Sequence, residues 1–355
     1  MISHFPTRQP TAGRPGRRPR AALVGVACVA LAAFAVATDA RAGDPREQTG
    51  FGSNPGNLRM FSHVPDGLPA AAALIVVLHG CKQTAAAFAR DAGWLAFAGR
   101  ARVALLLPEQ KGLPRHFHDV YLPPWMVAMG GGNNQNGCFN WFEPGDHARD
   151  RGEALSIRQM IETMIARHAL DRARVYIAGF SAGGAMAAAM LATYPELFAG
   201  GAIVTGVSYG CATSVFEALR CMEPGIDRSP AEWRRKVLES AGAGARFPPV
   251  TIWQGSADRR VVPQNQRELV EQWVAVHGIA DRPGRIDKSR MATRTQYLDA
   301  DGAVRVESVL VHGLRHAFPI ESGGALPCGQ AGEFVSAAGI CAAREIARFW
   351  GLTAD

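Results

Sequence analysis

Val175-Tyr176-Ile177-Ala178-Gly179-Phe180-Ser181-Ala182-Gly183 joins an apolar run typical of a buried strand to an alanine-rich run, residues 185–192, typical of a helix. Small residues on both sides of Ser181 allow a strained strand-to-helix turn, the nucleophile elbow, which exposes a serine hydroxyl. A glycine-rich helix start is the alternative interpretation, because the five-residue pattern 179–183 alone is a weak signal. The strand before it and the helix after it favour the elbow.

Outward from this turn, apolar runs and helical periodicities alternate along the chain. Continuous apolar runs, typical of strands buried on both faces, occupy residues 74–78, 103–107, 202–204 and 250–253. Two late strands are expected at 293–298 and 304–311, and helices at 84–101, 157–165, 269–274 and 331–350. This alternation predicts an α/β fold, a mostly parallel sheet with helices on both faces. We expect one catalytic domain over residues 43–355, with residues 43–57 as a loose lead-in.

The first 42 residues have the features of a secretory signal peptide. Arginines at 14, 17, 18 and 20 precede an apolar stretch over 21–37, and Ala40-Arg41-Ala42 has the small-x-small pattern of a cleavage site. We therefore expect a secreted mature protein, extracellular or periplasmic. A membrane anchor is the alternative, but the apolar stretch is short for a spanning helix.

Most of the positive charge of the chain lies in this leader. Six arginines and one aspartate give residues 1–42 a net charge of +5, so +2 of the total of +7 remains for residues 43–355. A nearly neutral mature protein gives no electrostatic reason to expect nucleic acid or an anionic membrane as a partner.

Six cysteines follow the leader, and an even number in an exported chain favours disulfides. Sequence alone leaves several pairings open. We favour Cys81–Cys138, Cys211–Cys221 and Cys328–Cys341, the last two because they close short loops. A zinc site is the alternative, but no CxxC or HxxxH spacing supports it.

The stretch 111–138 is long, aromatic and rich in glycine and asparagine, which is typical of a lid or a flexible loop. Residues 130–134 resemble a phosphate cradle but lack its lysine and following helix. His116 and His118 form an HxH pair that could chelate a metal on an exposed loop. We nevertheless predict no metal and no other cofactor.

A base and an acid for Ser181 follow it in the order expected for this architecture. Asp258 comes just after the strand 250–253, and His316 comes just after the last long strand. We expect His316 to take the proton from Ser181 and Asp258 to orient the imidazole. His312 is the competing base, and a turn aspartate neutralised by Arg259 and Arg260 is the alternative interpretation of Asp258.

His79-Gly80-Cys81 follows the buried strand 74–78. A glycine there lets the backbone approach a substrate, so the N–H groups of Cys81 and Ala182 are the candidate oxyanion donors. Trp141, Phe142 and Trp253 are candidate substrate contacts because they lie beside these motifs, although large aromatic residues more often belong to the core.

The ordered motifs resemble the poly(3-hydroxybutyrate) depolymerase-like serine esterases. The resemblance rests on Asn57-Leu58-Arg59-Met60, His79-Gly80-Cys81, Pro108-Glu109-Gln110, Cys138-Phe139-Asn140-Trp141-Phe142, Gly179–Gly184, Tyr209-Gly210-Cys211-Ala212 and the Asp258 and His316 segments. It implies the α/β-hydrolase fold and a serine esterase mechanism without metal, with Ser181, Asp258 and His316 as nucleophile, acid and base. Cys81 and Ala182 would supply the oxyanion hole. Relatives of this family include feruloyl and acetylxylan esterases.

Three departures from the family pattern bear on the substrate. The stretch 111–137 is longer than the short polar link that usually precedes the Cys-Phe-Asn-Trp segment in this family. Gln254 stands where histidine is common in the acid motif, and we expect no binding module for solid polymer after the final helix. We therefore expect an exported carboxylic-ester hydrolase that prefers oligomeric 3-hydroxybutyrate or other short-acyl esters to polymer granules. A carbohydrate esterase (feruloyl or acetylxylan) is the alternative, and an inactive α/β-hydrolase serving as a binding protein is a remote one.

Overall fold

The computed structural model describes residues 43–353 except 115–121, 130–131, 243 and 324–326. The expected signal peptide, 1–42, lies outside the described residues, as do His116, His118 and part of the glycine-rich stretch 130–134. Contacts divide the chain into Met1–Ala40 and Arg41–Asp355, and every element below belongs to the second unit.

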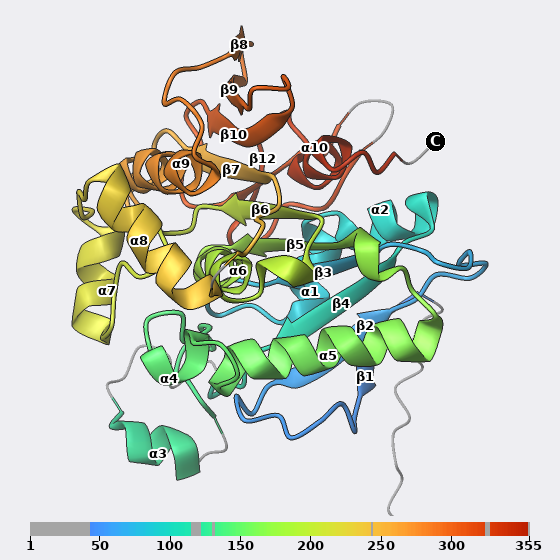
Figure 1. Ribbon diagram of the computed structural model, residues 1–355. Helices are drawn as coiled ribbons and strands as arrows, with labels where there is room; N and C mark the ends of the chain where they lie inside the picture. The colour runs from blue at the N-terminus through green and yellow to red at the C-terminus, as the bar shows by residue number, and fades with distance from the viewer. Residues whose placement is uncertain (1–42, 115–121, 130–131, 243, 324–326, 354–355) are drawn as a thin grey trace, which may run out of the picture. The chain divides into compact units, whose positions relative to one another are not determined.

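A ten-stranded sheet forms the centre of this unit (Figure 1). Its order is β1-β2-β4-β3-β5-β6-β7-β10-β9-β8. Neighbouring strands from β4 to β10 run parallel, whereas β1, β2, β9 and β8 add antiparallel edges. The strands are β1 (Arg46–Gln48), β2 (Arg59–His63), β3 (Leu74–Leu78), β4 (Ala104–Glu109), β5 (Val175–Phe180), β6 (Gly200–Val204), β7 (Val250–Gly255), β8 (Arg285–Lys288), β9 (Ala292–Leu298) and β10 (Val304–Val311).

Helices cover both faces of the sheet, and alternate residues of one strand enter the two cores. In β3, Leu74, Val76 and Leu78 pack with one set of helices, while Ile75 and Val77 pack with the other. The first core includes residues of α5 (Gly152–His168), α6 (Ala182–Thr193), α7 (Val215–Met222), α8 (Pro230–Ala241) and α9 (Gln264–His277). The second includes residues of α1 (Ala85–Asp91), α2 (Trp94–Ala101) and α10 (Ala342–Phe349). The expected α/β-hydrolase architecture is therefore present.

Several elements differ from those expected. The helix predicted over 84–101 is two helices, because Gly93 adopts a left-handed φ of 84° against Cys328, where a Cβ would lie 3.0 Å from the sulfur. The helix predicted over 331–350 begins only at Ala342, since β12 (Val335–Ala337) first pairs with β11 (Phe318–Ile320). The lead-in 43–57 contains β1, which pairs with β2.

The smaller elements were not predicted at all. Besides β8, α7 and α8, they include α3 (Pro124–Met129), α4 (Pro144–His147) and the 3₁₀ turns η2 (Arg172–Arg174) and η3 (Pro195–Leu197). Helix α8 begins at a capping box of Ser229 and Glu232, a signal that the sequence does carry. Within the described ranges, no helix has both the length and the apolar character needed to span a bilayer.

Three disulfides link Cys81 to Cys138, Cys211 to Cys221 and Cys328 to Cys341. These are the pairs favoured from the sequence. Two of them close loops of 10 and 13 residues, and the first joins segments 57 residues apart. The long-range disulfide lies at the candidate site described next.

Candidate active site

Ser181 lies at a sharp turn between β5 and α6. Its φ of 56° and ψ of −120° are a strained conformation for a residue with a side chain. The turn is possible because its neighbours are glycines: a Cβ on Gly179 would overlap the carbonyl oxygen of Gly183, and one on Gly183 would overlap that of Leu78. The predicted elbow is therefore present in the backbone.

The imidazole of His316 lies between Ser181 and Asp258. Its Nε2 is 3.0 Å from Oγ of Ser181, and its Nδ1 is 2.9 Å from Oδ2 of Asp258. The serine, aspartate and histidine follow the carboxyl ends of β5, β7 and β10, which meet at one edge of a parallel sheet. The structure thus brings together three side chains that are up to 135 residues apart.

Asp258 is 3% exposed and is held by hydrogen-bond donors. Its Oδ1 accepts the backbone N–H groups of Arg260 at 2.8 Å and Val261 at 3.0 Å. The side chain of Gln254 adds a donor: its Nε2 donates to Oδ2 of Asp258 at 3.3 Å and to the carbonyl of Val261 at 2.8 Å. This glutamine therefore braces both the acid and the loop that carries it.

The competing residues lie elsewhere or act differently. The exposed ring of His312 contacts the hydroxyl of Thr293 and the carbonyl of Arg290. The guanidinium of Arg260 lies over the ring of Phe334, and this residue reaches Asp258 through its backbone N–H. Asp258 is therefore a partner of His316 rather than of an arginine side chain.

The residues predicted to supply the oxyanion donors, Cys81 and Ala182, lie beside Ser181. Both residues line the same cavity as Ser181, and neither N–H has an acceptor in the described part of the chain. Ala182 is the first residue of α6, where an N–H has no carbonyl of its own helix to bind. A water or substrate oxygen over Ser181 would therefore find two backbone donors.

A buried histidine, His79, fixes the peptide that carries the Cys81 N–H. Its Nε2 accepts the N–H of Gln110 at 3.1 Å, so its Nδ1 carries the proton and donates to the carbonyl of Gly80 at 2.7 Å. In a trans peptide the C=O and N–H point in opposite directions, so this bond turns the N–H of Cys81 away from the ring. Burial lowers the pKa of His79 to about 4, which keeps the ring neutral.

The Cys138–Phe142 loop is held by its disulfide to Cys81 and by a buried carboxyl group, Glu153. The Glu153 carboxyl accepts hydrogen bonds from the side chain of Gln110 and, at 3.0 Å, from the N–H of Asn140. Burial raises the pKa of Glu153 well above its usual value. One side chain thus joins the segment that anchors His79 to the loop beside the site.

A cavity of about 260 Å³ contains Ser181 and His316, and its walls are mostly apolar. Trp141 and Phe142 line it, so their contact with substrate stays a prediction. Trp253 does not: it is 1% exposed, packs in the second core and donates its Nε1–H to Thr251. Its prediction as a substrate contact was wrong, because the alternation along β7 directs its side chain into the core.

Sequence reasoning missed one wall of this cavity, which is formed by α7. Val215, Ala218, Leu219 and Met222 all line it. They recur at i, i+3, i+4 and i+7, a spacing that predicts one helix face and could have been recognised. Phe334 is also in the lining and carries no comparable signal in the sequence.

The described residues contain no group of three or more histidine, cysteine, aspartate or glutamate side chains placed to hold a metal ion. The HxH pair proposed as a chelating alternative lies outside them. In the remaining part of the loop 111–138, Asn134 and Asn136 line the cavity. The loop therefore contributes to the site, although 115–121 and 130–131 are not described.

Comparison with known proteins gives consistent matches. A family model described as "Esterase PHB depolymerase" matches residues 63–296. Poly(3-hydroxyalkanoate) depolymerase C of Paucimonas lemoignei is 42% identical over 304 residues, covering 85% of this chain and 69% of that protein. Feruloyl esterase B of Neurospora crassa is 32% identical over 241 residues, covering 66% of this chain and 75% of that protein.

Among solved structures, the acetyl xylan esterase from Aspergillus awamori has a similar fold. Its TM-score is 0.65 at 24% sequence identity, and the match covers 77% of this chain and 94% of that one. At this identity the likeness concerns the fold alone.

Proposed function

Because this chain belongs to the esterase PHB depolymerase family and is a carboxylic-ester hydrolase, we propose that it cleaves esters of 3-hydroxybutyrate and similar short 3-hydroxyacids. The observation that carries the hydrolytic mechanism is the chain of contacts from Ser181 through His316 to Asp258, at 3.0 and 2.9 Å. The choice of substrate is supported by the 42% identity to poly(3-hydroxyalkanoate) depolymerase C. A serine, a base and an orienting acid in this order perform acyl transfer.

In the proposed reaction, Oγ of Ser181 attacks the ester carbonyl while Nε2 of His316 takes its proton. The N–H groups of Cys81 and Ala182 stabilise the oxyanion of the tetrahedral intermediate. The intermediate collapses as His316 gives the proton to the leaving alcohol, and an acyl group remains on Ser181. Water, deprotonated by His316, then attacks this acyl-enzyme and releases the acid and the free serine.

Asp258 accepts the Nδ1–H of His316 throughout this cycle. It holds the ring with Nε2 toward Ser181 and stabilises the imidazolium that forms in each half-reaction. The donors from Arg260, Val261 and Gln254 in turn keep the carboxylate in place. The apolar walls of the cavity favour a small aliphatic acyl group over a charged one.

We propose that the mature protein, residues 43–355, is one catalytic domain and works outside the cytoplasm. The leader pattern and the three disulfides support export, because disulfides persist in oxidising compartments. The proposed substrate is an ester, oligomeric or small, and no further cofactor takes part in the steps above.

The test is a comparison of three ester classes with the exported wild-type protein and Ser181→Ala. We expect hydrolysis of 3-hydroxybutyrate oligomers to exceed that of methyl ferulate and acetylated xylan. The alanine variant should lose at least about a thousandfold in kcat while its thermal unfolding is unchanged. Faster hydrolysis of either plant ester would replace the substrate assignment with a carbohydrate esterase. Wild-type protein unreactive toward a fluorophosphonate would contradict the serine mechanism itself.

A further inference from the structure

Helix α7 exposes large apolar side chains at the surface. Val215 is 48% exposed, Phe216 78% and Leu219 57%. Together they are three of the seven large apolar residues recorded as exposed among the described residues. Figure 1 shows α7 at the left edge of the molecule, beside α8. We call Val215, Phe216 and Leu219 the α7 face. Apolar surface gathered on two turns of one helix is a mark of a contact site.

Helix α7 is held in position at both ends, so the side chains of the α7 face cannot easily turn into the protein interior. Ser214 caps its first turn, and the Cys211–Cys221 disulfide ties its last turn to the preceding loop. The carbonyl of Met222 accepts the N–H of Val262 at 3.0 Å and the side chain of Asn265 at 3.2 Å. The exposure of these side chains is therefore a property of the helix in its place.

The α7 face is continuous with the wall of the catalytic cavity. Val215 and Leu219 line that cavity together with Ala218 and Met222, whereas Phe216 does not. One side of α7 thus lines the cavity that contains Ser181, while Phe216 lies on the protein surface outside that cavity. A small ester can fill the cavity without touching Phe216, but a long chain with one ester at Ser181 extends beyond the cavity.

The sequence alone favours soluble esters over polymer granules, but the exposed α7 face adds a contact that the sequence did not indicate. We propose that the α7 face docks on the surface of a water-insoluble aliphatic polyester, the polymeric form of the ester held at Ser181. This inference rests on the proposed function. Such a polymer is uncharged and bears methyl and methylene groups at its surface, so contact with the α7 face removes apolar area from water on both sides. The neighbouring exposed residues Glu217 and Arg220 would remain at the edge of the contact, in water.

Adsorption to poly(3-hydroxybutyrate) film, measured in a Ser181→Ala background so that the film is not digested, tests this docking. Adding Phe216→Ser should weaken adsorption by about tenfold or more, as expected for a large apolar side chain that loses its contact. The matched control is Ile286→Ser on β8, which is 55% exposed and lies at the top of Figure 1, well apart from α7. The Ile286→Ser variant should adsorb as strongly as the Ser181→Ala protein from which it is made.

With Ser181 intact, Phe216→Ser should hydrolyse a soluble 3-hydroxybutyrate dimer at the wild-type kcat/KM. Equal adsorption of the Phe216 and Ile286 variants would overturn the inference. The inference would also be overturned if the wild-type protein were a homodimer in solution and Phe216→Ser made it monomeric, since the α7 face would then bind a second copy of the chain. If the wild-type protein adsorbs to the film but does not hydrolyse the 3-hydroxybutyrate dimer, the proposed function fails. If it hydrolyses this substrate but adsorbs equally well with and without Phe216, only the docking proposal fails.

Discussion

At the scale of single residues, the site depends on groups that are strained or buried. Ser181 holds a positive φ that a side chain disfavours, and the packing of α6 against β3 maintains it. His79 and Asp258 are buried and polar, and each is fully occupied by specific partners. Small changes at these positions therefore have large and distinct effects.

His79 predicts an acid-sensitive step in stability. Its pKa is about 4 in the folded protein against 6.5 for an ordinary histidine, so the unfolded state binds the proton first as the pH falls. The free energy of unfolding should therefore fall from pH 6.5 downward. Between pH 7 and pH 5 the wild type should lose about 2 kcal/mol more than His79→Gln.

Urea titrations of both proteins at several pH values measure this difference. Between pH 7 and pH 8 the two stability curves should run parallel, because the imidazole is then neutral in the folded and the unfolded state. An equal loss in both proteins on acidification would mean that His79 is protonated in the folded protein and that the tautomer assigned here is wrong.

The sequence could identify the three candidate triad residues of the site but not all of the residues around them. The order of Ser181, Asp258 and His316 and the strand ends before them are local signals, and they predicted which side chains meet. Trp253 was misassigned because nearness to a motif does not reveal which core a strand residue faces. The role of His79 depends on Gln110, 31 residues away, and no local pattern carries such a contact.

At the scale of elements, the junction of β5 and α6 positions Ser181, the proposed nucleophile. Gly183 packs so closely on β3 that a Cβ would overlap the carbonyl oxygens of Leu78 and His79. These obstacles are backbone atoms of a central strand, which cannot turn away as a side chain could. The first turn of α6 is therefore tied to the strand that leads into the oxyanion loop.

Gly183→Ala should push α6 away from β3, lowering the free energy of unfolding by about 2–4 kcal/mol and displacing Ser181 and the Ala182 N–H. Activity should fall more than the folded fraction does. Gly99→Ala is the matched control, because Gly99 is also helical but has nothing within 4 Å of the added Cβ. It should be neutral or stabilising by up to about 1 kcal/mol. Calorimetry and ester hydrolysis check both variants, and a harmless Gly183→Ala would contradict the close packing.

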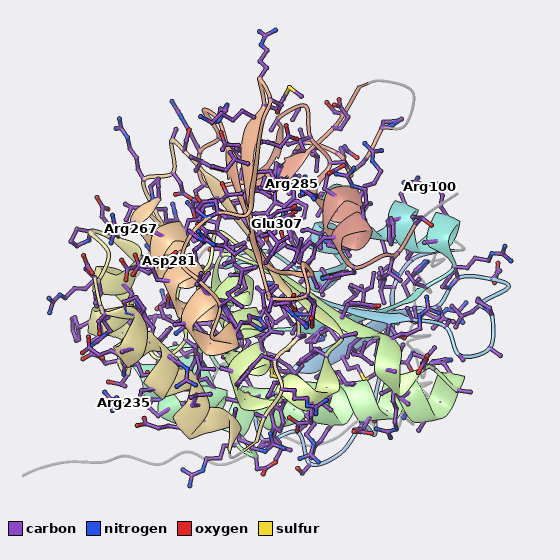
Figure 2. All side chains as sticks on the ribbon, turned by 45° about the horizontal axis from the view of Figure 1, so that its top comes forward. Arg100, Arg235, Arg267, Asp281, Arg285 and Glu307 are labelled. Carbon is purple, nitrogen blue, oxygen red and sulfur yellow. A yellow bond between two sulfur atoms is a disulfide. The ribbon has the colours of Figure 1, made fainter. Side chains whose placement is uncertain are left out.

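A second set of contacts links β9, β10 and α10. Arg294 lies 2.8 Å from the buried carboxylate of Glu307, which is labelled in Figure 2, and 2.9 Å from Glu345 of α10. Arg294→Met should cost about 3–5 kcal/mol, because Glu307 would keep neutral donors but lose its buried counter-charge. The double variant Arg294→Met/Glu307→Gln should recover much of this loss in urea unfolding. No recovery would show that packing of the arginine, not charge, stabilises the sheet.

Elements were predictable where burial was uniform. Strands β3, β5 and β7 are buried along their whole length and were expected near their observed bounds. The edge strand β8 is exposed along its whole length, so it has no alternation of apolar and polar residues to recognise. The break between α1 and α2 arises from the contact of Gly93 with Cys328, far along the chain, which local propensity does not indicate.

At the scale of the whole molecule, the three disulfides should have separable effects. Cys328→Ser/Cys341→Ser opens a 13-residue loop and should lower the free energy of unfolding by about 3 kcal/mol with little change in kcat. Cys81→Ser/Cys138→Ser opens a 57-residue loop beside the proposed oxyanion donors, so about 4 kcal/mol and part of kcat should be lost together. Equal kcat in the two double variants would mean that the long-range disulfide does not hold the oxyanion loop.

The separation of 135 residues between Ser181 and His316 has a practical consequence. A fragment that stops before residue 316 should not hydrolyse an ester, since its serine would have no base. Turnover of a chromogenic ester is then a reporter of complete tertiary assembly, and during renaturation it should return in step with tryptophan fluorescence rather than ahead of it.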